Sequence, residues 1–197
     1  MNERIKAVLS DHIAVQQAIL ADEELLQTKQ TVADLTVDAF RADRKALFCG
    51  NGGSAADAQH LAAELSGRFY LDRPPLLAEA LHVNTSFLTA VANDYGYEEV
   101  FARWIHGIGR AGDVFFAFST SGNSPNMLRA VQEARNRQLT VVGFTGQTGG
   151  KMAAFCDHLI RVPSTDTPRI QEGHLLVGHL ICELVETALF GPDAPVN

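Results

Sequence analysis

A chain of 197 residues is long enough to bury one hydrophobic core and too short for two ordinary domains. Its composition, 46% hydrophobic and 20% charged, is that of a globular protein, and the net charge of −7 argues against a nucleic-acid ligand. The N-terminus lacks a signal-peptide core, and no apolar run reaches the ~20 residues that span a bilayer. Cys49, Cys156 and Cys182 lie far apart in apolar contexts, as reduced thiols do. We therefore expect a cytoplasmic protein without a membrane partner.

Residues 1–42 are expected to form a helical arm of two helices. Apolar residues recur at helical spacing from Ile5 to Phe40, and residues 3–42 contain neither Gly nor Pro. An amphipathic segment of this length must bury its apolar stripe, and a partner subunit is a good candidate to cover it.

Beyond the arm, short β-rich runs alternate with helical stretches. Strands are predicted at 46–49, 114–119, 141–145 and 159–162, with a weaker one near 77–81, and helices near 54–66, 97–108, 125–137 and 169–189. This alternation, with fully apolar strands, predicts an α/β fold: a three-layer sandwich with a central parallel sheet flanked by helices. No linker interrupts the pattern. We therefore expect a single domain over 1–197, with an α/β core at 43–190.

Ligands of such sheets bind beyond the carboxyl ends of the strands, where the first glycine-rich loop lies. Gly50-Asn51-Gly52-Gly53-Ser54 connects an apolar strand to a helix, so its backbone and the helix N-terminus can approach an anion closely. The loop is neither a P-loop nor a dinucleotide-binding motif. An ordinary tight turn with Ser54 as the helix cap is the alternative.

A second loop carries four hydroxyls within six residues, again between a strand and a helix. Ser119, Thr120, Ser121 and Ser124 precede Pro125, a residue that suits the first turn of a helix. One serine would serve as a cap, whereas four hydroxyls favour a phosphate monoester bound together with backbone N–H groups. Neither loop contains a lysine, so dipoles and hydroxyls would hold the anion.

Two histidines and a carboxylate are candidates for chemistry. His60 and Glu64 are four residues apart, so they lie on one face of the helix after the first loop and can clamp a divalent metal. A solvated face with a weak ion pair is the alternative. His179 lies in the apolar C-terminal helix, where a histidine is more often a core or interface residue.

Four separated motifs resemble the phosphoheptose isomerases, which are sugar isomerase (SIS) domain proteins. The motifs are Gly50–His60 continuing to Glu64, Ala92–Gly96, Ser119–Ser124, and Arg169–His174 followed by His179. The match is collinear from about residue 40 to 190, and the helical arm also fits. Any one motif would be weak, but four in order are specific. The resemblance implies the SIS fold, which is flavodoxin-like.

The resemblance also implies roles for individual residues. The substrate phosphate would bind to Ser119, Thr120, Ser121 and Ser124. The rest of the substrate would contact Asn51, Gly52, Gly53, Ser54, Glu64, Arg68, Asn93, Asp94 and Gln171. One zinc per subunit would be held by His60, Glu64, Gln171 and His179. Glu64 and His179 would form the acid/base pair.

The activity that the resemblance implies is the conversion of sedoheptulose 7-phosphate to D-glycero-D-manno-heptose 7-phosphate through an enediol. This is the first step of ADP- or GDP-heptose biosynthesis, which supplies lipopolysaccharide core or another surface glycan. A homotetramer is implied as well. The alternative is a non-catalytic SIS regulator such as the replication initiator-associating protein, and the presence of His179 with His60 and Glu64 favours catalysis.

One spacing opposes a site built from a single chain. Gln171 and His179 are separated by a rise of about 12 Å on a straight helix, too far for one ion. Either the helix bends near Gly173 or Gly178, or different subunits contribute these two ligands. We favour a site shared between subunits.

Overall fold

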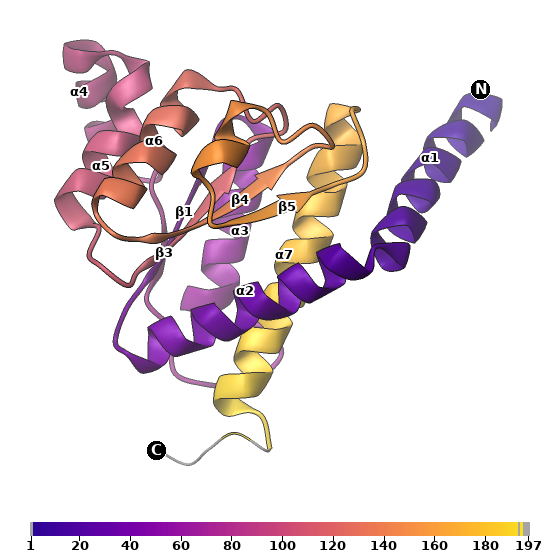
Figure 1. The fold of residues 1–197 in the computed structure, drawn as a ribbon, viewed down its shortest axis with the longest axis horizontal. Coiled ribbons are helices and arrows are strands. Elements are labelled where there is room, and N and C mark those ends of the chain that lie inside the picture. The colour runs from indigo at the N-terminus through magenta and orange to yellow at the C-terminus, as the bar shows by residue number, and fades with distance from the viewer. Residues whose placement is uncertain (1, 193, 195–197) are drawn as a thin grey trace.

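The computed structural model describes residues 2–192 and residue 194 of the chain. Its centre is a five-stranded sheet in which all neighbouring strands are parallel, in the order β2-β1-β3-β4-β5 (Figure 1). The strands are β1 Ala46–Gly50, β2 Ala78–Ala80, β3 Val114–Phe118, β4 Thr140–Thr145 and β5 His158–Arg161. The predicted parallel sheet, including the weaker strand near 77–81, is confirmed.

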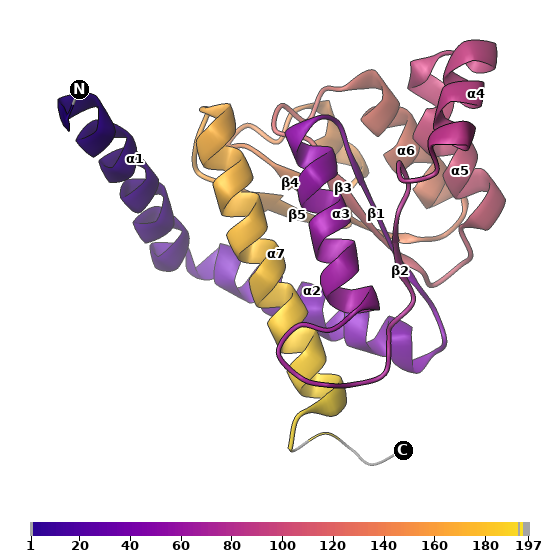
Figure 2. The ribbon, with the colours of Figure 1, turned by 180° about the vertical axis from the view of Figure 1, so that it is seen from behind.

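Helices cover both faces of this sheet, as the fold class requires. They are α1 Asn2–Ala21, α2 Glu23–Arg41, α3 Gly53–Ser66, α4 Thr85–Tyr95, α5 Val100–Ile108, α6 Pro125–Asn136 and α7 Thr167–Phe190, with short 3-10 helices η1 Tyr97–Glu99 and η2 Lys151–Phe155. Helices α2, α3 and α7 lie on one face, and α4, α5 and α6 lie on the other. Figure 2 shows α3 and α7 side by side in front of the sheet.

Alternate strand residues feed two separate cores, because successive side chains of a strand point to opposite faces. Phe48 and Phe116, from neighbouring strands, stack with ring centroids 4.6 Å apart in the core beneath α2, α3 and α7. Leu47 and Phe115 are buried in the core beneath α4, α5 and α6. Strands that are buried on both faces explain the unbroken apolar runs in the sequence.

The N-terminal segment forms two helices, and they behave differently. Asp22 caps α2 by accepting a hydrogen bond from Leu25 N–H at 2.9 Å, which separates it from α1. Helix α2 packs against α7 and β5, so it belongs to the core layer. Helix α1 buries only Ile19 and projects from the molecule (Figure 1). The projecting part of the arm therefore ends near Ala21.

Two elements differ from the sequence-based expectation. The sequence pattern does not predict helix α4. Val91 is the only buried residue of this helix, so its apolar pattern is weak. The expected helix at 97–108 begins as the 3-10 turn η1 before α5.

Helix α7 is long and apolar enough to cross a membrane by length and composition alone, but much of it is buried against α2 and α3.

The sheet order places the two loops beside each other. Strands β1 and β3 are adjacent, and their last residues, Gly50 and Phe118, are paired in register. From β1 the chain continues to β2 at one edge of the sheet and then crosses to β3 on the other side of β1. A topological switch point therefore lies between β1 and β3. Ligands of open parallel sheets bind at such a point, beyond the carboxyl ends of the strands.

Candidate active site

A cavity of about 200 Å³ opens at this switch point. It is lined by Asn51, Ser54, Phe118, Ser119, Thr120, Ser124, Thr167 and Gln171. The N-termini of α3 and α6 both begin at its edge, so helix dipoles and free N–H groups favour an anion there. Thr167 opens α7 and adds a hydroxyl that sequence reasoning did not identify, since it precedes Pro168 like an ordinary helix start.

The structure contradicts Ser54 as the cap of α3 but confirms Ser124 as the N-cap residue of α6. The N-cap of α3 is Gly52, whose φ of 56° suits glycine, and Ser54 is buried inside the helix. Ser124 is the N-cap of α6, but its side chain makes no capping hydrogen bond, and its Oγ lies 3.5 Å from Ser119 Oγ. The hydroxyls of Ser119 and Ser124 therefore remain available to a ligand.

The loop after β3 is held rigidly by the loop after β4. Gly146 N–H donates to Thr120 O at 3.0 Å, and Met152 N–H donates to Gly122 O at 2.9 Å. A Cβ on Gly122, which has φ of 63°, would overlap the Gly149 carbonyl. Ser121 Oγ accepts a hydrogen bond from Asn123 N–H at 3.2 Å, so this hydroxyl supports the turn and does not line the cavity.

Asn51 is fixed by partners that the sequence does not reveal. Asn51 and Asn126 exchange two amide hydrogen bonds of 2.9 and 2.8 Å, and Asn126 is only 3% exposed. The Tyr97 hydroxyl also donates to Asn51 Oδ1 at 3.1 Å. Asn126 and Tyr97 therefore orient the Asn51 side chain that lines the cavity.

His60, Glu64 and His179 form a cluster further along α3 and α7. The Nε2 atoms of His60 and His179 are 3.0 Å apart, and Glu64 Oε1 lies 2.9 Å from His60 Nε2. One ligand atom from each of the three residues lies within 4.8 Å of the others. Two imidazole nitrogens and one carboxylate oxygen match the donor set of catalytic zinc sites, which keep a fourth position open.

Close packing of α3 on α7 brings the cluster together. A Cβ on Gly178 would overlap the Leu61 side chain, so only glycine lets the two helices approach this closely. Leu61 follows His60, and Gly178 precedes His179, so the contact lies directly beside the facing imidazoles. His174, on the same helix, is a core residue: it is fully buried, with Nε2 3.1 Å from Thr145 O.

The electrostatics of the cluster favour a cation. Burial lowers the pKa of His179, the charge of His60 lowers it further, and Glu64 partly opposes the shift. Asp57, one turn before His60, has its pKa raised to about 6 by burial, against the opposing charge of His60. Its Oδ2 is buried without a hydrogen bond among the described residues. At neutral pH His179 is a neutral ligand and Asp57 adds negative charge nearby.

Gln171 lies near the start of α7, eight residues before His179. Helix α7 is continuous from Thr167 to Phe190, so Gly173 and Gly178 do not break it. The Gln171 amide lies against Gly53, where an added Cβ would overlap it, and Gln171 lines the anion cavity. Within one chain, Gln171 and His179 are therefore separated by a rise of about 12 Å along the helix.

Three further predicted site residues do not line the cavity. Arg68 is exposed in the segment after α3. Asn93 and Asp94 are exposed near the end of α4, where Asn93 Nδ2 donates to Asp94 Oδ1 at 2.8 Å. Within one chain these side chains face solvent.

Comparisons with known proteins agree on one family. Models described as the SIS domain match residues 13–146 and 108–187. A phosphoheptose isomerase from Aneurinibacillus thermoaerophilus is 52% identical over 190 residues, which is 96% of each chain. The solved phosphoheptose isomerase GmhA from Neisseria gonorrhoeae has 42% identity and a TM-score of 0.88, covering 94% of this chain and 98% of that one. The phosphoheptose isomerase structure from Francisella tularensis has 32% identity and a TM-score of 0.90, covering 94% and 97%.

Proposed function

Because the chain belongs to the SIS domain family and, within it, to the phosphoheptose isomerases, we propose that it converts sedoheptulose 7-phosphate to D-glycero-D-manno-heptose 7-phosphate. One observation carries the proposal: the chain combines a hydroxyl-lined anion cavity with the His60–Glu64–His179 cluster. A non-catalytic regulator does not need such a cluster, and that alternative is not favoured.

The phosphate of the substrate occupies the cavity between the two loops. Ser119, Thr120 and Ser124 donate hydroxyl hydrogen bonds, and the N-termini of α3 and α6 supply backbone N–H groups. Ser121 contributes through its loop, whose shape its hydroxyl maintains. Asn51, Gly52, Gly53 and Ser54 contact the sugar chain, and so do Arg68, Asn93, Asp94 and Gln171. Neutral donors bind the phosphate without a lysine, which suits an acidic protein.

Isomerisation of a 2-ketose moves one proton between carbons and another between oxygens. Glu64 removes the proton from C1, which gives the enediol, and returns it to C2. His179 accepts the proton of the C1 hydroxyl and supplies a proton to the C2 oxygen, so the reaction is balanced. Burial, and then the charge of His60, lower the pKa of His179, which favours the neutral imidazole when no metal is bound.

Zinc fits the cluster by donor chemistry and by spacing. In a tetrahedral site with bonds of about 2.0 to 2.1 Å, neighbouring ligand atoms lie roughly 3.4 Å apart. The observed separations of 3.0 and 2.9 Å are close to this value, and all three ligand atoms lie within 4.8 Å of one another. His60, Glu64 and His179 would hold one zinc per subunit, with Gln171 as the fourth ligand. When bound, zinc supplies a Lewis acid beside the substrate carbonyl.

Two distances support a site shared between subunits. Ser54 at the cavity and Glu64 in the cluster are ten residues apart on α3, a rise of about 15 Å. An extended heptulose spans roughly 10 Å from C1 to phosphorus, because each of the eight bonds advances the chain by about 1.2 Å. Gln171 and His179 are likewise too far apart to ligate one ion. Both conflicts are removed if a second copy of the chain places its own cavity and its own Gln171 beside the His60–Glu64–His179 cluster of the first.

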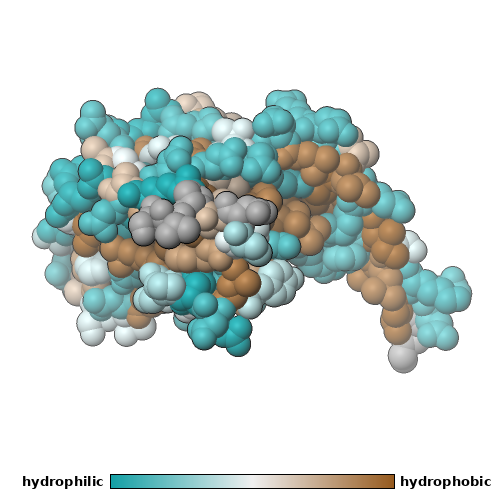
Figure 3. All heavy atoms as spheres, turned by 90° about the horizontal axis from the view of Figure 1, so that it is seen from below, coloured by the Kyte–Doolittle hydropathy of each residue, from teal (hydrophilic) through white to brown (hydrophobic). Residues whose placement is uncertain are grey.

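The arm offers a surface for that second copy. Ile5, Leu9 and Ile13 recur every four residues on α1, and each is more than half exposed. Figure 3 shows these hydrophobic side chains as a brown stripe along the projecting arm. A stripe of this kind indicates a protein–protein contact. We place the chain in a homotetramer in the cytoplasm, where it supplies heptose for lipopolysaccharide core or another surface glycan.

The test is NMR of sedoheptulose 7-phosphate incubated with metal-stripped protein and again after zinc is restored. The proposal expects an aldoheptose 7-phosphate to appear, with the rate depending on zinc. Folded protein that yields no product in either state would exclude the isomerase and return the regulator to consideration. Product formed equally without metal would keep the isomerase and remove zinc from it.

A further inference from the structure

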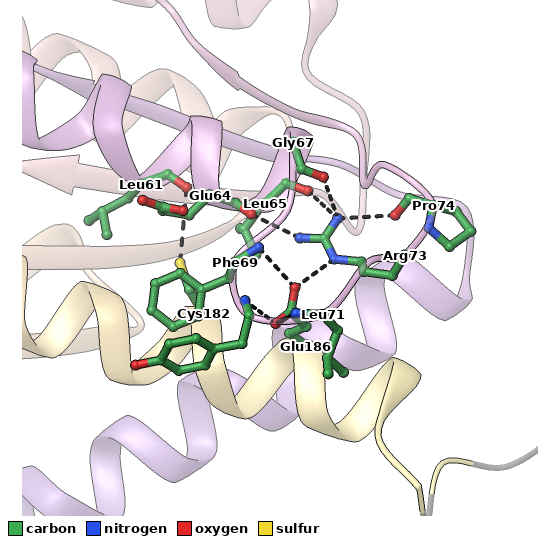
Figure 4. A network of polar contacts seen from close by, with 11 residues as sticks. Leu61, Glu64, Leu65, Gly67, Phe69, Leu71, Arg73, Pro74, Cys182 and Glu186 are labelled. Atoms are coloured by element: carbon green, nitrogen blue, oxygen red, sulfur yellow. Dashed lines mark hydrogen bonds and ion pairs between the residues drawn. The ribbon is translucent and has the colours of Figure 1, made fainter.

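A single buried carboxylate ties the segment after α3 to α7. Glu186 Oε2 accepts hydrogen bonds from Tyr70 and Leu71 N–H at 2.7 and 2.9 Å. Glu186 Oε1 accepts from Phe69 N–H and from Arg73 Nε, both at 3.0 Å. The Arg73 and Glu186 side chains are only 1% and 2% exposed. Figure 4 shows the carboxylate enclosed by this turn, a contact that no local sequence pattern indicates.

The other face of Arg73 closes the end of α3. Its Nη2 donates to Glu64 O at 2.8 Å, and its Nη1 donates to Leu65 O at 2.7 Å and to Gly67 O at 3.1 Å. The last carbonyls of a helix have no partner within the helix, so one guanidinium satisfies them here. The backbone of Glu64, the residue that we assign as base, is therefore fixed by Arg73.

The same turn places an aromatic ring against the second catalytic residue. The Phe69 ring is stacked on the His179 imidazole, with centroids 5.6 Å apart and planes 27° apart. His179 and Glu186 lie on the same side of α7, seven residues or about two turns apart. One ion pair thus holds the turn that carries Phe69 and the helix end that carries Glu64.

We infer that the Arg73–Glu186 pair is a positioning element of the isomerase site, which sets His179 through Phe69 and Glu64 through the end of α3. The inference rests on the proposed function for its catalytic consequence. A purely structural role is the competing explanation, because buried ion pairs also hold loops in place. The two roles differ in what happens to turnover when the protein remains folded.

The chain offers a matched control in the loop just before β3. Asp113, with a side chain 1% exposed, pairs with Lys45 Nζ at 2.7 Å and accepts from Arg110 N–H at 2.8 Å and Lys45 N–H at 3.1 Å. It precedes β3, and its partners Lys45 and Arg110 belong to neither α3, α7 nor the turn that carries Phe69. Asp113→Asn therefore removes an equivalent buried carboxylate without touching the site.

The experiment compares Glu186→Gln, Arg73→Lys and Phe69→Leu with Asp113→Asn, below the unfolding temperature of each variant. For the first three we expect kcat to fall at least about tenfold, because displaced catalytic groups lose alignment. KM should change less than about threefold, since the phosphate cavity lies at the N-terminal ends of α3, α6 and α7, away from this turn. Asp113→Asn should lower Tm and keep kcat. Equal kcat in Glu186→Gln and Asp113→Asn would overturn the inference.

A second readout does not depend on activity or metal. In protein with labelled Phe and His, we expect a nuclear Overhauser contact between the Phe69 and His179 rings in the wild type and in Asp113→Asn. The contact should disappear in Glu186→Gln, and its persistence there would overturn the inference. If the wild type lacks isomerase activity, the proposed function fails, and this comparison still decides whether Glu186 positions the ring.

Discussion

His60 and His179 are 119 residues apart in the sequence, yet their Nε2 atoms are 3.0 Å apart. Two protonated imidazoles at this distance would repel each other, and the pKa of His179 is lowered by burial and then by the charge of His60. Two imidazole nitrogens with the Glu64 carboxylate beside them provide the donor set that a metal cation needs. The first prediction tests this relationship.

Replacing His179 should abolish turnover while keeping the fold. In His179→Ala we expect kcat to fall by about 10² to 10⁴, because the acid/base group at oxygen is lost, and zinc affinity to fall with it. Tm should change little, since His179 is only partly buried. His106→Ala is the control, because His106 also pairs with a carboxylate, Glu133, at 2.7 Å, but on the far layer. Turnover retained in His179→Ala would remove this residue from the mechanism.

A methyl group at position 178 should push the two helices apart. In Gly178→Ala the new Cβ overlaps Leu61, and overpacking of this kind costs about 1 to 3 kcal/mol. We expect lower stability and weaker zinc binding, because His60 and His179 separate. The double variant Leu61→Ala with Gly178→Ala should recover zinc affinity relative to Gly178→Ala, as isothermal titration can measure. Strictly additive effects on zinc affinity would show that this contact does not set the spacing of the imidazoles.

A methyl group at position 53 should affect substrate more than stability. In Gly53→Ala the new Cβ overlaps only the amide end of Gln171, a flexible group that can move aside. We expect Tm within a few degrees of the wild type, because Ala is favourable in a helix. The KM for the sugar phosphate should rise, because Gln171 is displaced from the anion cavity. An unchanged KM and kcat would mean that Gln171 has no part in binding.

The sequence predicts the sheet, its flanking helices and the loops of the cavity because each depends on local pattern. Unbroken apolar runs give the strands, and glycines or hydroxyls directly after β1 and β3 give the two loops. The spacing of His60 and Glu64 likewise predicts one helix face. Whether His179 belongs to the core or to the cluster is decided by the packing of α3 on α7, which no local pattern contains.

The residues that sequence reasoning missed are joined by contacts between distant segments. Asn126 and Asn51 are 75 residues apart, and Arg73 and Glu186 are 113 residues apart. In the sequence, Glu186 is one more acidic residue of an amphipathic helix and Arg73 one more basic residue of a loop. Helix α4 was missed for a different reason: it is mostly exposed, so its apolar period is weak.

The buried His174 should make stability depend on pH. Burial lowers its pKa to about 4, although the hydrogen bond with Thr145 raises it, whereas an exposed histidine titrates near 6.5. Between these two pH values, the imidazole is therefore protonated in the unfolded chain and neutral in the folded chain. The stability that this group contributes is complete above pH 6.5 and is lost as the pH falls toward 4, by up to about 1.4 kcal/mol per unit.

Urea unfolding between pH 7 and pH 5 measures this contribution. His174→Gln should be less stable than the wild type at pH 7 and should show a shallower loss of unfolding free energy on acidification. His158→Gln serves as the control, because this histidine lies on strand β5, away from the buried pocket of His174, and its replacement should leave the slope unchanged. Equal slopes for the wild type and His174→Gln would contradict a neutral buried imidazole.

Subunit mixing tests whether one site is built from two chains. Gln171→Ala and His179→Ala should each be inactive alone, since each removes a group that we assign to the site. Mixed after dissociation and reassembled, they should regain part of the activity, because some sites combine Gln171 of one subunit with His179 of another. The same variants joined in one chain should stay inactive, which controls for wild-type contamination. Failure to recover activity in confirmed mixed oligomers would require both residues to act from the same chain, and the rise of about 12 Å along the unbroken α7 opposes that arrangement.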